Sequence, residues 1–183
     1  MKVKGNIIKS RVAYVKERFG EDAWQKILAS LPEGDRPQLT KATNIGWYEF
    51  EVGDRLDKAI VQVLGGGKTQ VFEDMGRASA RENLTTVHSS FLQPRDPAKF
   101  MAKAPVIYSF YYDKGKRTWE PTGPTSGMLV TTGSETFSTA DCATVIGWYK
   151  EALGMLGAQN VTIVEETCCA GGADACRYRV SWS

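Results

Sequence analysis

The stretch VEETCCAGGADACRYRVSWS, residues 164–183, holds three of the four cysteines of this 183-residue chain. Residues rich in β-branched and aromatic side chains lie on either side of the Gly-Gly pair at 171–172. This pattern predicts a β-hairpin over residues 160–182. A hairpin brings the side chains of its two strands together, so the cysteines are explained by a disulfide, a catalytic thiol or a metal site.

The spacing of the cysteines is compatible with a metal site. Glu165 and Cys168 are three residues apart, Cys176 follows across the Gly-Gly turn, and Cys142 lies upstream, near the start of a predicted helix. Three thiolates and one carboxylate complete the four-coordinate shell that is typical of structural zinc. Buried cysteine also behaves as a small hydrophobic residue, so spacing alone leaves a plain core open as well.

The adjacent pairs in the hairpin leave a choice of ligands. Neighbouring residues of a strand point to opposite faces, so Cys168 and Cys169 do not easily serve together. Glu166 with Cys169 is therefore an alternative to Glu165 with Cys168.

Composition and charge narrow the class of protein. The net charge is +2, from 23 basic and 21 acidic residues, which gives no electrostatic reason to expect nucleic acid as a partner. The opening MKVKGNIIKS lacks the apolar region of a signal peptide, and no run reaches the roughly 18 apolar residues of a membrane span. We expect a cytoplasmic protein, in which thiols stay reduced, and this counts against a disulfide.

The first half of the chain has helical periodicity. Apolar spacings of three and four predict one or two helices over 6–31 with a possible break at Gly20, a helix from about Asp54, and another over 69–91. Residues 45–53 are expected to be extended. Over 98–113 a helix is preferred, although Pro105 and the aromatic residues also allow a strand.

The second half mixes strands and helices. TWEP at 118–121 and GMLVTT at 127–132 are strand candidates, and a helix is predicted over 139–156 with Ser138 or Thr139 as its cap. The fold class is therefore α+β, with N-terminal helices packed on a small antiparallel sheet that ends in a zinc-binding hairpin. We expect one domain over 1–183, helical in 1–95 and α/β in 96–183.

The segment GGGKT at 65–69 suggests a nucleotide-binding loop. A Walker loop needs a glycine five positions before Gly67, and that position is Gln62. The segment before GGGKT is also predicted to be a helix, whereas a Walker loop follows a strand. A helix end followed by a surface loop is the preferred interpretation.

The hairpin resembles a known family. Glu-x-x-Cys, a Gly-containing turn and Cys-x-aromatic-x-Val-x-Trp are similar to the C-terminal signature of the 4-vinyl-reductase-type small-molecule-binding domain, to which the sensor domains of phenol-responsive transcription activators belong. The resemblance implies a single vinyl-reductase-type domain. It also implies a structural zinc site formed by Cys142, Glu165, Cys168 and Cys176.

Other parts of the chain resemble related families. RVAYVKERFGEDAWQKIL, WYEFEVGDRLDKAIV, ENLTTVH and TADCATVIGWYKEAL look like a bacterial family of stand-alone paralogous proteins. RFGEDAW is similar to the opening of heme nitric-oxide-binding domains, over one helix only. The larger superfamily includes subunits of the vesicle-tethering TRAPP complex.

The vinyl-reductase resemblance implies a hydrophobic cavity between helices and sheet. His88 and Trp119 lie in regions comparable to the ligand-binding histidine and tryptophan of phenol sensors, and Tyr108 and Phe110 are further candidates. His88 as a helix-end or surface residue and the aromatic residues as core are the alternatives. Heme is expected to be unlikely, because the Tyr-x-Ser-x-Arg signature of nitric-oxide sensors is missing.

These observations favour a non-catalytic sensor domain with structural zinc. We expect a homodimer that binds a small hydrophobic or aromatic ligand and neither nucleic acid nor a membrane. Two alternatives stay open: a protein-interaction scaffold like the TRAPP subunits, and an enzyme associated with tetrapyrrole reduction.

Overall fold

The computed structural model describes residues 1–64, 66, 69–86, 88–134 and 138–183. Its elements confirm the α+β class. The helices are α1 (Gly5–Phe19), α2 (Glu21–Ser30), α3 (Arg36–Thr40), α4 (Phe50–Val63), α5 (Gln70–Thr85), α6 (Pro97–Met101), α7 (Ala104–Tyr111) and α8 (Thr139–Met155), with 3-10 turns η1 (Ser89–Leu92) and η2 (Cys169–Gly171). The strands are β1 (Lys2–Lys4), β2 (Trp47–Glu49), β3 (Lys116–Gly123), β4 (Ser126–Thr132), β5 (Thr162–Thr167) and β6 (Ala175–Ser181).

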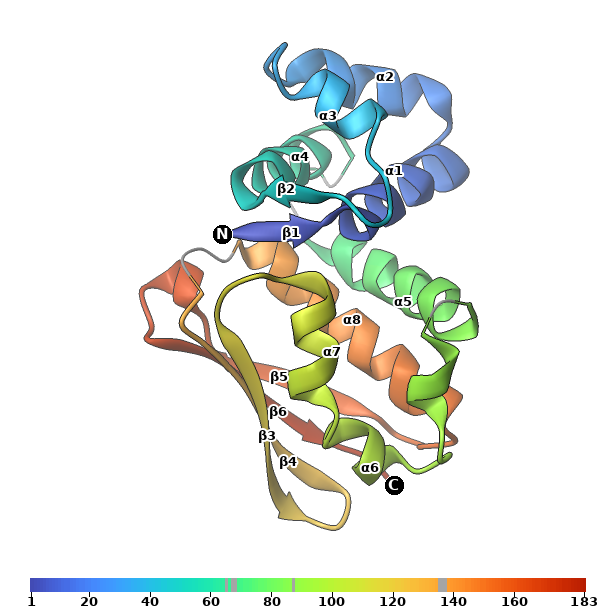
Figure 1. Ribbon diagram of the computed structural model, residues 1–183, viewed down its shortest axis with the longest axis vertical. Coiled ribbons are helices and arrows are strands. Elements are labelled where there is room, and N and C mark those ends of the chain that lie inside the picture. The colour runs from blue at the N-terminus through green and yellow to red at the C-terminus, as the bar shows by residue number, and fades with distance from the viewer. Residues whose placement is uncertain (65, 67–68, 87, 135–137) are drawn as a thin grey trace.

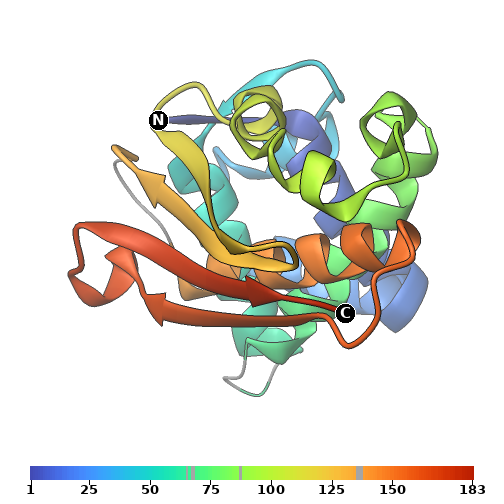
Figure 2. The ribbon, with the colours of Figure 1, turned by 90° about the horizontal axis from the view of Figure 1, so that it is seen from below.

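The larger sheet has four antiparallel strands in the order β3-β4-β6-β5. Side chains alternate between its two faces, and Cys176, Tyr178 and Val180 of β6 are all fully buried. Helices α7 and α8 lie over this buried face, as Figures 1 and 2 show. The predicted hairpin is therefore present as β5 and β6, and its inner face contributes to the hydrophobic core.

Helices α5 and α8 pack with almost no side chain between them. A Cβ atom on Gly76 of α5 would overlap the carbonyl oxygen of Thr144, and one on Gly147 of α8 would overlap that of Glu73. Only glycine allows such an approach of two backbones. The two helices consequently form one tight layer behind the sheet (Figure 1).

The N-terminal helices form a second layer above α5 and α8 (Figure 1). Their apolar faces meet in a cluster that contains Trp24 and Ile27 of α2 and Leu56 and Ile60 of α4. Strand β1 pairs with β2, and Val3 also bridges to Tyr112 just after α7. These pairings connect the N-terminal layer to the half that carries the sheet.

Several boundaries differ from the predictions for physical reasons. Gly20 separates α1 from α2 at a positive φ of 86°, which confirms the predicted break. The helix expected from Asp54 begins earlier, at Phe50, and the one expected over 69–91 ends at Thr85 before a 3-10 turn. Residues 98–113 form two helices, α6 and α7, and Pro105 lies in the first turn of α7, where its missing N–H costs no hydrogen bond.

Part of the GGGKT segment lies outside the described residues, namely positions 65, 67 and 68. The preceding element is the helix α4, which agrees with the interpretation of this segment as a helix end. Within the described ranges the structure contains no helix whose length and apolar content would let it cross a bilayer.

Candidate functional site

Three side chains of the hairpin and one from α8 converge on one point. Cys142 comes from the first turns of α8, Glu165 from β5, Cys168 from the turn that follows it, and Cys176 from β6. The sulfur of Cys142 lies 3.6 Å from that of Cys168 and 3.7 Å from that of Cys176. One ligand atom from each of the four residues lies within 4.8 Å of all the others.

This spacing matches the requirements of a tetrahedral metal ion. Zinc–sulfur bonds of about 2.3 Å place two sulfurs about 3.8 Å apart at tetrahedral angles. The Oε1 atom of Glu165 is buried and has no hydrogen-bond partner, so its lone pairs are free. The structure thus brings the four predicted ligands together, while metal binding itself stays a prediction.

The alternative pair of ligands points elsewhere. The carboxylate of Glu166 accepts a hydrogen bond of 2.6 Å from Arg179 on the exposed side of the sheet. The backbone N–H of Cys169 donates to the sulfur of Cys176 at 3.3 Å, and the Cys169 thiol is not part of the four-residue group. Cys169 is therefore a neighbour of the group, which we call the cysteine cluster (Cys142, Glu165, Cys168 and Cys176).

The sulfurs of the cysteine cluster influence one another's pKa values. A hydrogen bond from Cys142, together with the backbone N–H of Cys169, lowers the pKa of Cys176 to about 6. The same contact raises the pKa of Cys142, and burial adds to that rise. Cys176 is therefore the member that is ready to be a thiolate, the form that binds metals.

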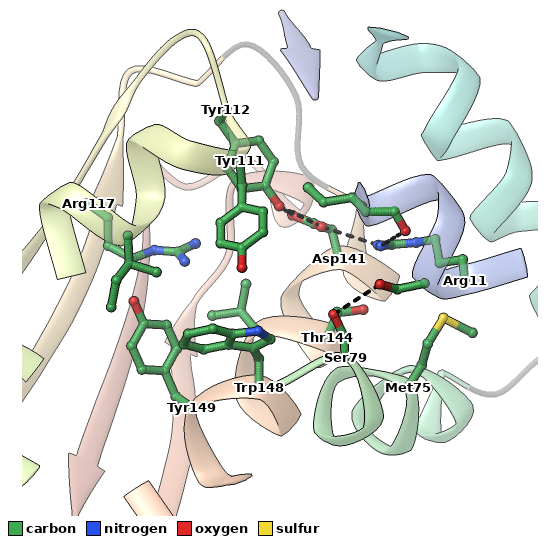
Figure 3. A pocket seen from close by; sticks show the side chains of 14 residues that line it. Arg11, Met75, Ser79, Tyr111, Tyr112, Arg117, Asp141, Thr144, Trp148 and Tyr149 are labelled. Carbon is green, nitrogen blue, oxygen red and sulfur yellow. Dashed lines mark hydrogen bonds and ion pairs between the residues drawn. The ribbon is translucent and has the colours of Figure 1, made fainter. Parts of the chain in front are cut away.

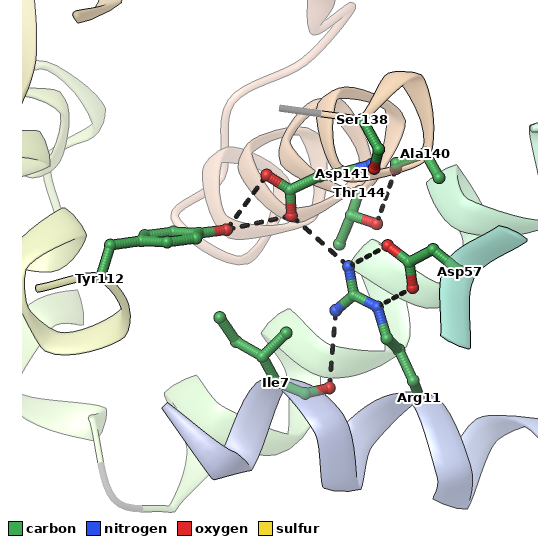
Figure 4. Close-up of polar contacts among 8 residues, drawn as sticks. All are labelled: Ile7, Arg11, Asp57, Tyr112, Ser138, Ala140, Asp141 and Thr144. Carbon is green, nitrogen blue, oxygen red and sulfur yellow. Dashed lines mark hydrogen bonds and ion pairs between the residues drawn. The ribbon is translucent and has the colours of Figure 1, made fainter. Parts of the chain in front are cut away.

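A buried ionic network links three helices next to this cluster (Figure 4). Arg11 of α1 donates to both carboxylate oxygens of Asp57 in α4, with Nη2–Oδ2 at 3.0 Å, and lies 3.4 Å from Asp141 of α8. The hydroxyl of Tyr112 donates to Asp141 at 3.0 Å. Each of these side chains is nearly inaccessible to solvent. A network of this kind fixes the relative positions of the elements it joins.

The start of α8 is fixed by its own cap. The hydroxyl of Ser138 accepts a hydrogen bond from the backbone N–H of Asp141 at 3.0 Å, which confirms the predicted cap. Asp141 therefore faces the ionic network, and the next residue, Cys142, belongs to the cysteine cluster. The two sites meet on consecutive residues of one helix.

A cavity of about 60 Å³ lies between α1, α5, α7, α8 and β3. Arg11 and Asp141 line one side, and Arg117, Tyr111 and Tyr149 line another (Figure 3). Three polar atoms of the lining residues are buried and make no hydrogen bond of good geometry in the described residues: Nη2 of Arg117 and the hydroxyls of Tyr111 and Tyr149. Arg117 and Tyr149 lie close to each other, and the arginine opposes the rise that burial causes in the pKa of Tyr149. Because buried polar atoms are almost always paired, this wall is the most unusual polar feature of the cavity.

The sequence analysis missed this site. Arg11 and Asp57 are 46 residues apart, and Arg11 and Asp141 are 130 apart, so no local pattern connects them. The one usable signal is the position of Arg11 between the apolar residues Ile8 and Val15, on a helix face that is otherwise buried. Charged residues on amphipathic helices usually face solvent, and this one does not.

The four residues predicted to bind ligand lie outside the cavity. The ring of His88 packs against Phe110 and Tyr111, at 5.2 and 5.8 Å between ring centres, and burial lowers its pKa. Phe110 is 45% exposed on the outer side of α7.

The other two predicted residues are also held by neighbours. Tyr108 stacks on Tyr112 and donates its hydroxyl to the backbone of Lys114. Trp119 of β3 lies against Trp182, with 6.2 Å between ring centres. A role of these four residues in ligand binding stays a prediction.

The fold has close structural relatives. An H-NOX protein from S. oneidensis in the Fe(II)NO state aligns with a TM-score of 0.77, 15% identity, and coverage of 98% of this chain and 99% of that one. An unliganded Fe(II) H-NOX protein from K. algicida aligns at 0.74 with 12% identity, covering 98% and 96% of the two chains. A third structure, from work on heme distortion in the H-NOX family, aligns at 0.76 with 12% identity, covering 98% and 95%. At such identities the likeness establishes the fold alone.

These comparisons correct two predictions. The assignment to the 4-vinyl-reductase-type domain was wrong, because it came from a short C-terminal signature, whereas the H-NOX fold matches helices and sheet together over 98% of the chain. The likeness to heme nitric-oxide-binding domains is thus not confined to one helix. The expectation that heme is unlikely was also wrong, because the proteins that share this fold are heme-binding proteins.

Sequence comparison gives the family. A search of curated proteins finds no match. A family described as "Protein of unknown function (DUF2378)" matches residues 12–183, which is nearly the whole chain. The chain belongs to this DUF2378 family, and its fold is that of the H-NOX proteins.

Proposed function

We propose that this protein is a non-catalytic small-molecule sensor domain that binds its ligand in the cavity between α1, α5, α7, α8 and β3. The observation that carries the proposal is that three residues with buried polar atoms outside any hydrogen bond of good geometry, Arg117, Tyr111 and Tyr149, line one cavity. A ligand-binding protein needs a preformed cavity with a few polar groups whose hydrogen bonds are left for the ligand. The shared fold with H-NOX proteins supports a binding role and leaves the ligand open.

The position of the cavity supports a sensing role. Its wall includes Met75 from the cluster of the N-terminal helices and Ile107 and Val145 from the cluster around the sheet. The ionic network of Arg11, Asp57, Asp141 and Tyr112 crosses the same junction (Figure 4). A ligand at this junction contacts both layers, so its binding free energy depends on how they are packed.

The size of the cavity limits the ligand. About 60 Å³ is far below the roughly 300–1,000 Å³ of ordinary ligand pockets. It is also below the roughly 150 Å³ of an engineered cavity that binds benzene. In this conformation the site takes a molecule of a few heavy atoms, and the aromatic ligand expected from the sequence requires a wider cavity.

Heme is the candidate cofactor suggested by the H-NOX structures of the same fold. Arg117 offers a cation of the kind that binds a carboxylate. The cavity, however, has too little room for a porphyrin, and the single histidine of the chain, His88, is not among the residues that line it. A heme would therefore require a wider cavity than this arrangement has. No step of the proposal depends on heme, and heme binding is tested directly below.

We further propose that the cysteine cluster binds a zinc ion with a structural role. The ion would join the start of α8 to both strands of the hairpin, and its binding free energy would add to the stability of the folded state. The sulfur spacings of 3.6 and 3.7 Å and the free Oε1 of Glu165 support this proposal. Four protein ligands leave no position for a reactive water, as in structural sites.

The alternative functions have less support. The tetrapyrrole enzyme was suggested by the vinyl-reductase resemblance, which the fold comparison overturns. A scaffold needs a broad exposed apolar surface. The large exposed apolar residues of the described chain are instead spread over several elements, and only Val106 and Phe110 share a helix: Phe19, Ile45, Trp47, Val63, Val106, Phe110 and Val164.

A ligand-observed NMR screen of small uncharged molecules tests the sensor proposal. We expect hits with the wild-type protein that are lost in Ser79→Leu, which fills the cavity from α5. Ser109→Leu, on the exposed side of α7, is the matched control and should keep them. Titration with heme, followed by its absorption spectrum, forms a separate arm. Hits that bind Ser79→Leu as well as wild type would place the ligand elsewhere.

A further inference from the structure

We infer that the cavity is a receptor site for a small monocarboxylate anion, with Arg117 as its counter-charge. This inference rests on the proposed function and specifies its ligand. It starts from the one cation in the wall that no carboxylate neutralises. Arg117 is 4% exposed, and its Nε donates to the hydroxyl of Thr131 at 2.9 Å, while its Nη2 has no partner in the described residues.

The other buried arginine that lines the cavity, Arg11, has the carboxylate partners that Arg117 lacks in the described residues. Arg11 is as buried as Arg117, and it has two carboxylates within ion-pair distance, Asp57 and Asp141. No such pair involves Arg117 in the part of the chain that the structure describes. Because arginine stays charged in proteins and an unpaired buried charge is costly, this site favours an anion supplied from outside.

The cysteine cluster forms no direct pair with Arg117 in the described residues, and Tyr178, which interacts with both Arg117 and Cys142, lies between them. Arg117 lies opposite Thr131 in β4, and Thr131 lies opposite Cys176 in β6. Two strand spacings of about 4.8 Å therefore separate Arg117 from Cys176. The faces of Tyr108 and Tyr149 lie 5.0 and 5.9 Å from the guanidinium, and such contacts compensate a buried charge only in part.

Two hydroxyl donors complete the wall. Tyr111 and Tyr149 both line the cavity, and Figure 3 shows both rings on the side of Arg117. The Tyr111 hydroxyl has no partner in the described residues, and the Tyr149 hydroxyl has only its neighbour Arg117. A guanidinium and two hydroxyls together offer donors to an acceptor that carries negative charge. A carboxylate has only acceptors and matches this set.

The opposite wall and the volume define the rest of the ligand. Asp141 lies there with Arg11, and its negative charge disfavours a second carboxylate on the ligand. A cavity of about 60 Å³ has room for a few water-sized groups, since about 10–15 Å³ of such volume holds one water molecule. Formate and acetate have this size, so they are the probes of choice.

Isothermal titration calorimetry of the full chain tests the inference, with sodium acetate, sodium formate and the neutral isostere acetamide in a carboxylate-free buffer. Sodium chloride keeps the ionic strength constant. We expect acetate and formate to bind at least tenfold more tightly than acetamide. Arg117→Met should abolish this preference and keep the fold, because it removes an uncompensated buried charge. Tyr149→Phe, which loses one donor, should weaken acetate binding several-fold.

The outcomes separate the two proposals. If acetamide binds as well as acetate, or if Arg117→Met binds acetate like wild type, the anion inference falls and the sensor proposal stands. If none of these probes binds and the screen of uncharged molecules is also negative, both fall. Loss of zinc from Arg117→Met without any acetate binding by wild type would make Arg117 a counter-ion of the cysteine cluster and overturn the inference.

Discussion

The sulfurs of Cys142 and Cys176 lie 3.7 Å apart although 34 residues separate them, which ties the start of α8 to the last strand of the sheet. We predict that the protein contains one zinc ion per chain, as measured by elemental analysis. Cys176→Ser should lose the metal and lower the free energy of unfolding by several kcal/mol, on the order of 10 °C in Tm.

Cys169→Ser is the matched control for this experiment. Its thiol lies beside the cysteine cluster without belonging to it, so the zinc content should be unchanged. Equal zinc in both variants, or no zinc in the wild type purified without chelators, would refute the metal site.

The glycine contacts between α5 and α8 predict a large effect of one methyl group. Gly147→Ala places a Cβ atom against the carbonyl oxygen of Glu73 and should cost about 1–3 kcal/mol or more. Gly154→Ala in the same helix has nothing within 4 Å of the new atom and should stabilise by about 0.5–1 kcal/mol. Urea denaturation of the two variants measures both, and similar stabilities would contradict the close packing.

The ionic network predicts an unusual pH dependence. Burial raises the pKa of Asp57 from 3.8 to about 6, against the opposing effect of Arg11. The folded state therefore binds this proton more tightly than the unfolded state does. The resulting stabilisation is complete below about pH 4 and is lost as the pH rises through 6. A shift of two pKa units corresponds to about 3 kcal/mol.

Comparison with Asp57→Asn isolates this effect from the other carboxyl groups. The difference in unfolding free energy between wild type and Asp57→Asn should move by about 3 kcal/mol between pH 4 and pH 7, to the disadvantage of wild type. Denaturant titrations at several pH values give this difference. A difference that is constant, or that moves towards wild type as the pH rises, would show that Asp57 is ionised throughout.

Two adjacent tyrosines predict opposite results for the same substitution. The hydroxyl of Tyr112 donates to Asp141 in the buried network, so Tyr112→Phe should cost about 1.5–3 kcal/mol. The hydroxyl of Tyr111 is buried without a partner, so Tyr111→Phe should be neutral or stabilising in the absence of ligand. Thermal unfolding in carboxylate-free buffer measures both. A larger loss for Tyr111→Phe would mean that its hydroxyl is satisfied in the protein alone.

Local patterns in the sequence predicted the elements well. Gly20 and the apolar spacing correctly predicted the break between α1 and α2. The Gly-Gly pair correctly predicted the hairpin that carries three of the cysteines. The short strand β1 was missed, because three residues carry no usable periodicity and its partner β2 begins only at Trp47.

The family and the cavity depended on long-range information. A signature of one hairpin is shared by folds whose other parts differ, so it led to the wrong family. Arg117 reads as an ordinary charged residue of a strand, and only the packing of α7 and α8 over β3 makes it buried. The polar atoms that define the candidate site are therefore visible in three dimensions and not in the chain order.

The close backbone contact of α5 with α8 also limits which walls of the cavity can move. One wall of the cavity is formed by Met75 and Ser79 of α5 and by Thr144 and Trp148 of α8. The contacts at two glycines hold these helices so close together that they cannot approach further. A bound ligand would contact this closely packed helix pair on one side, and α1, α7 and the guanidinium of Arg117 on the other. For the proposed sensor we therefore expect binding to displace α1 and α7 and to leave α5 and α8 in place.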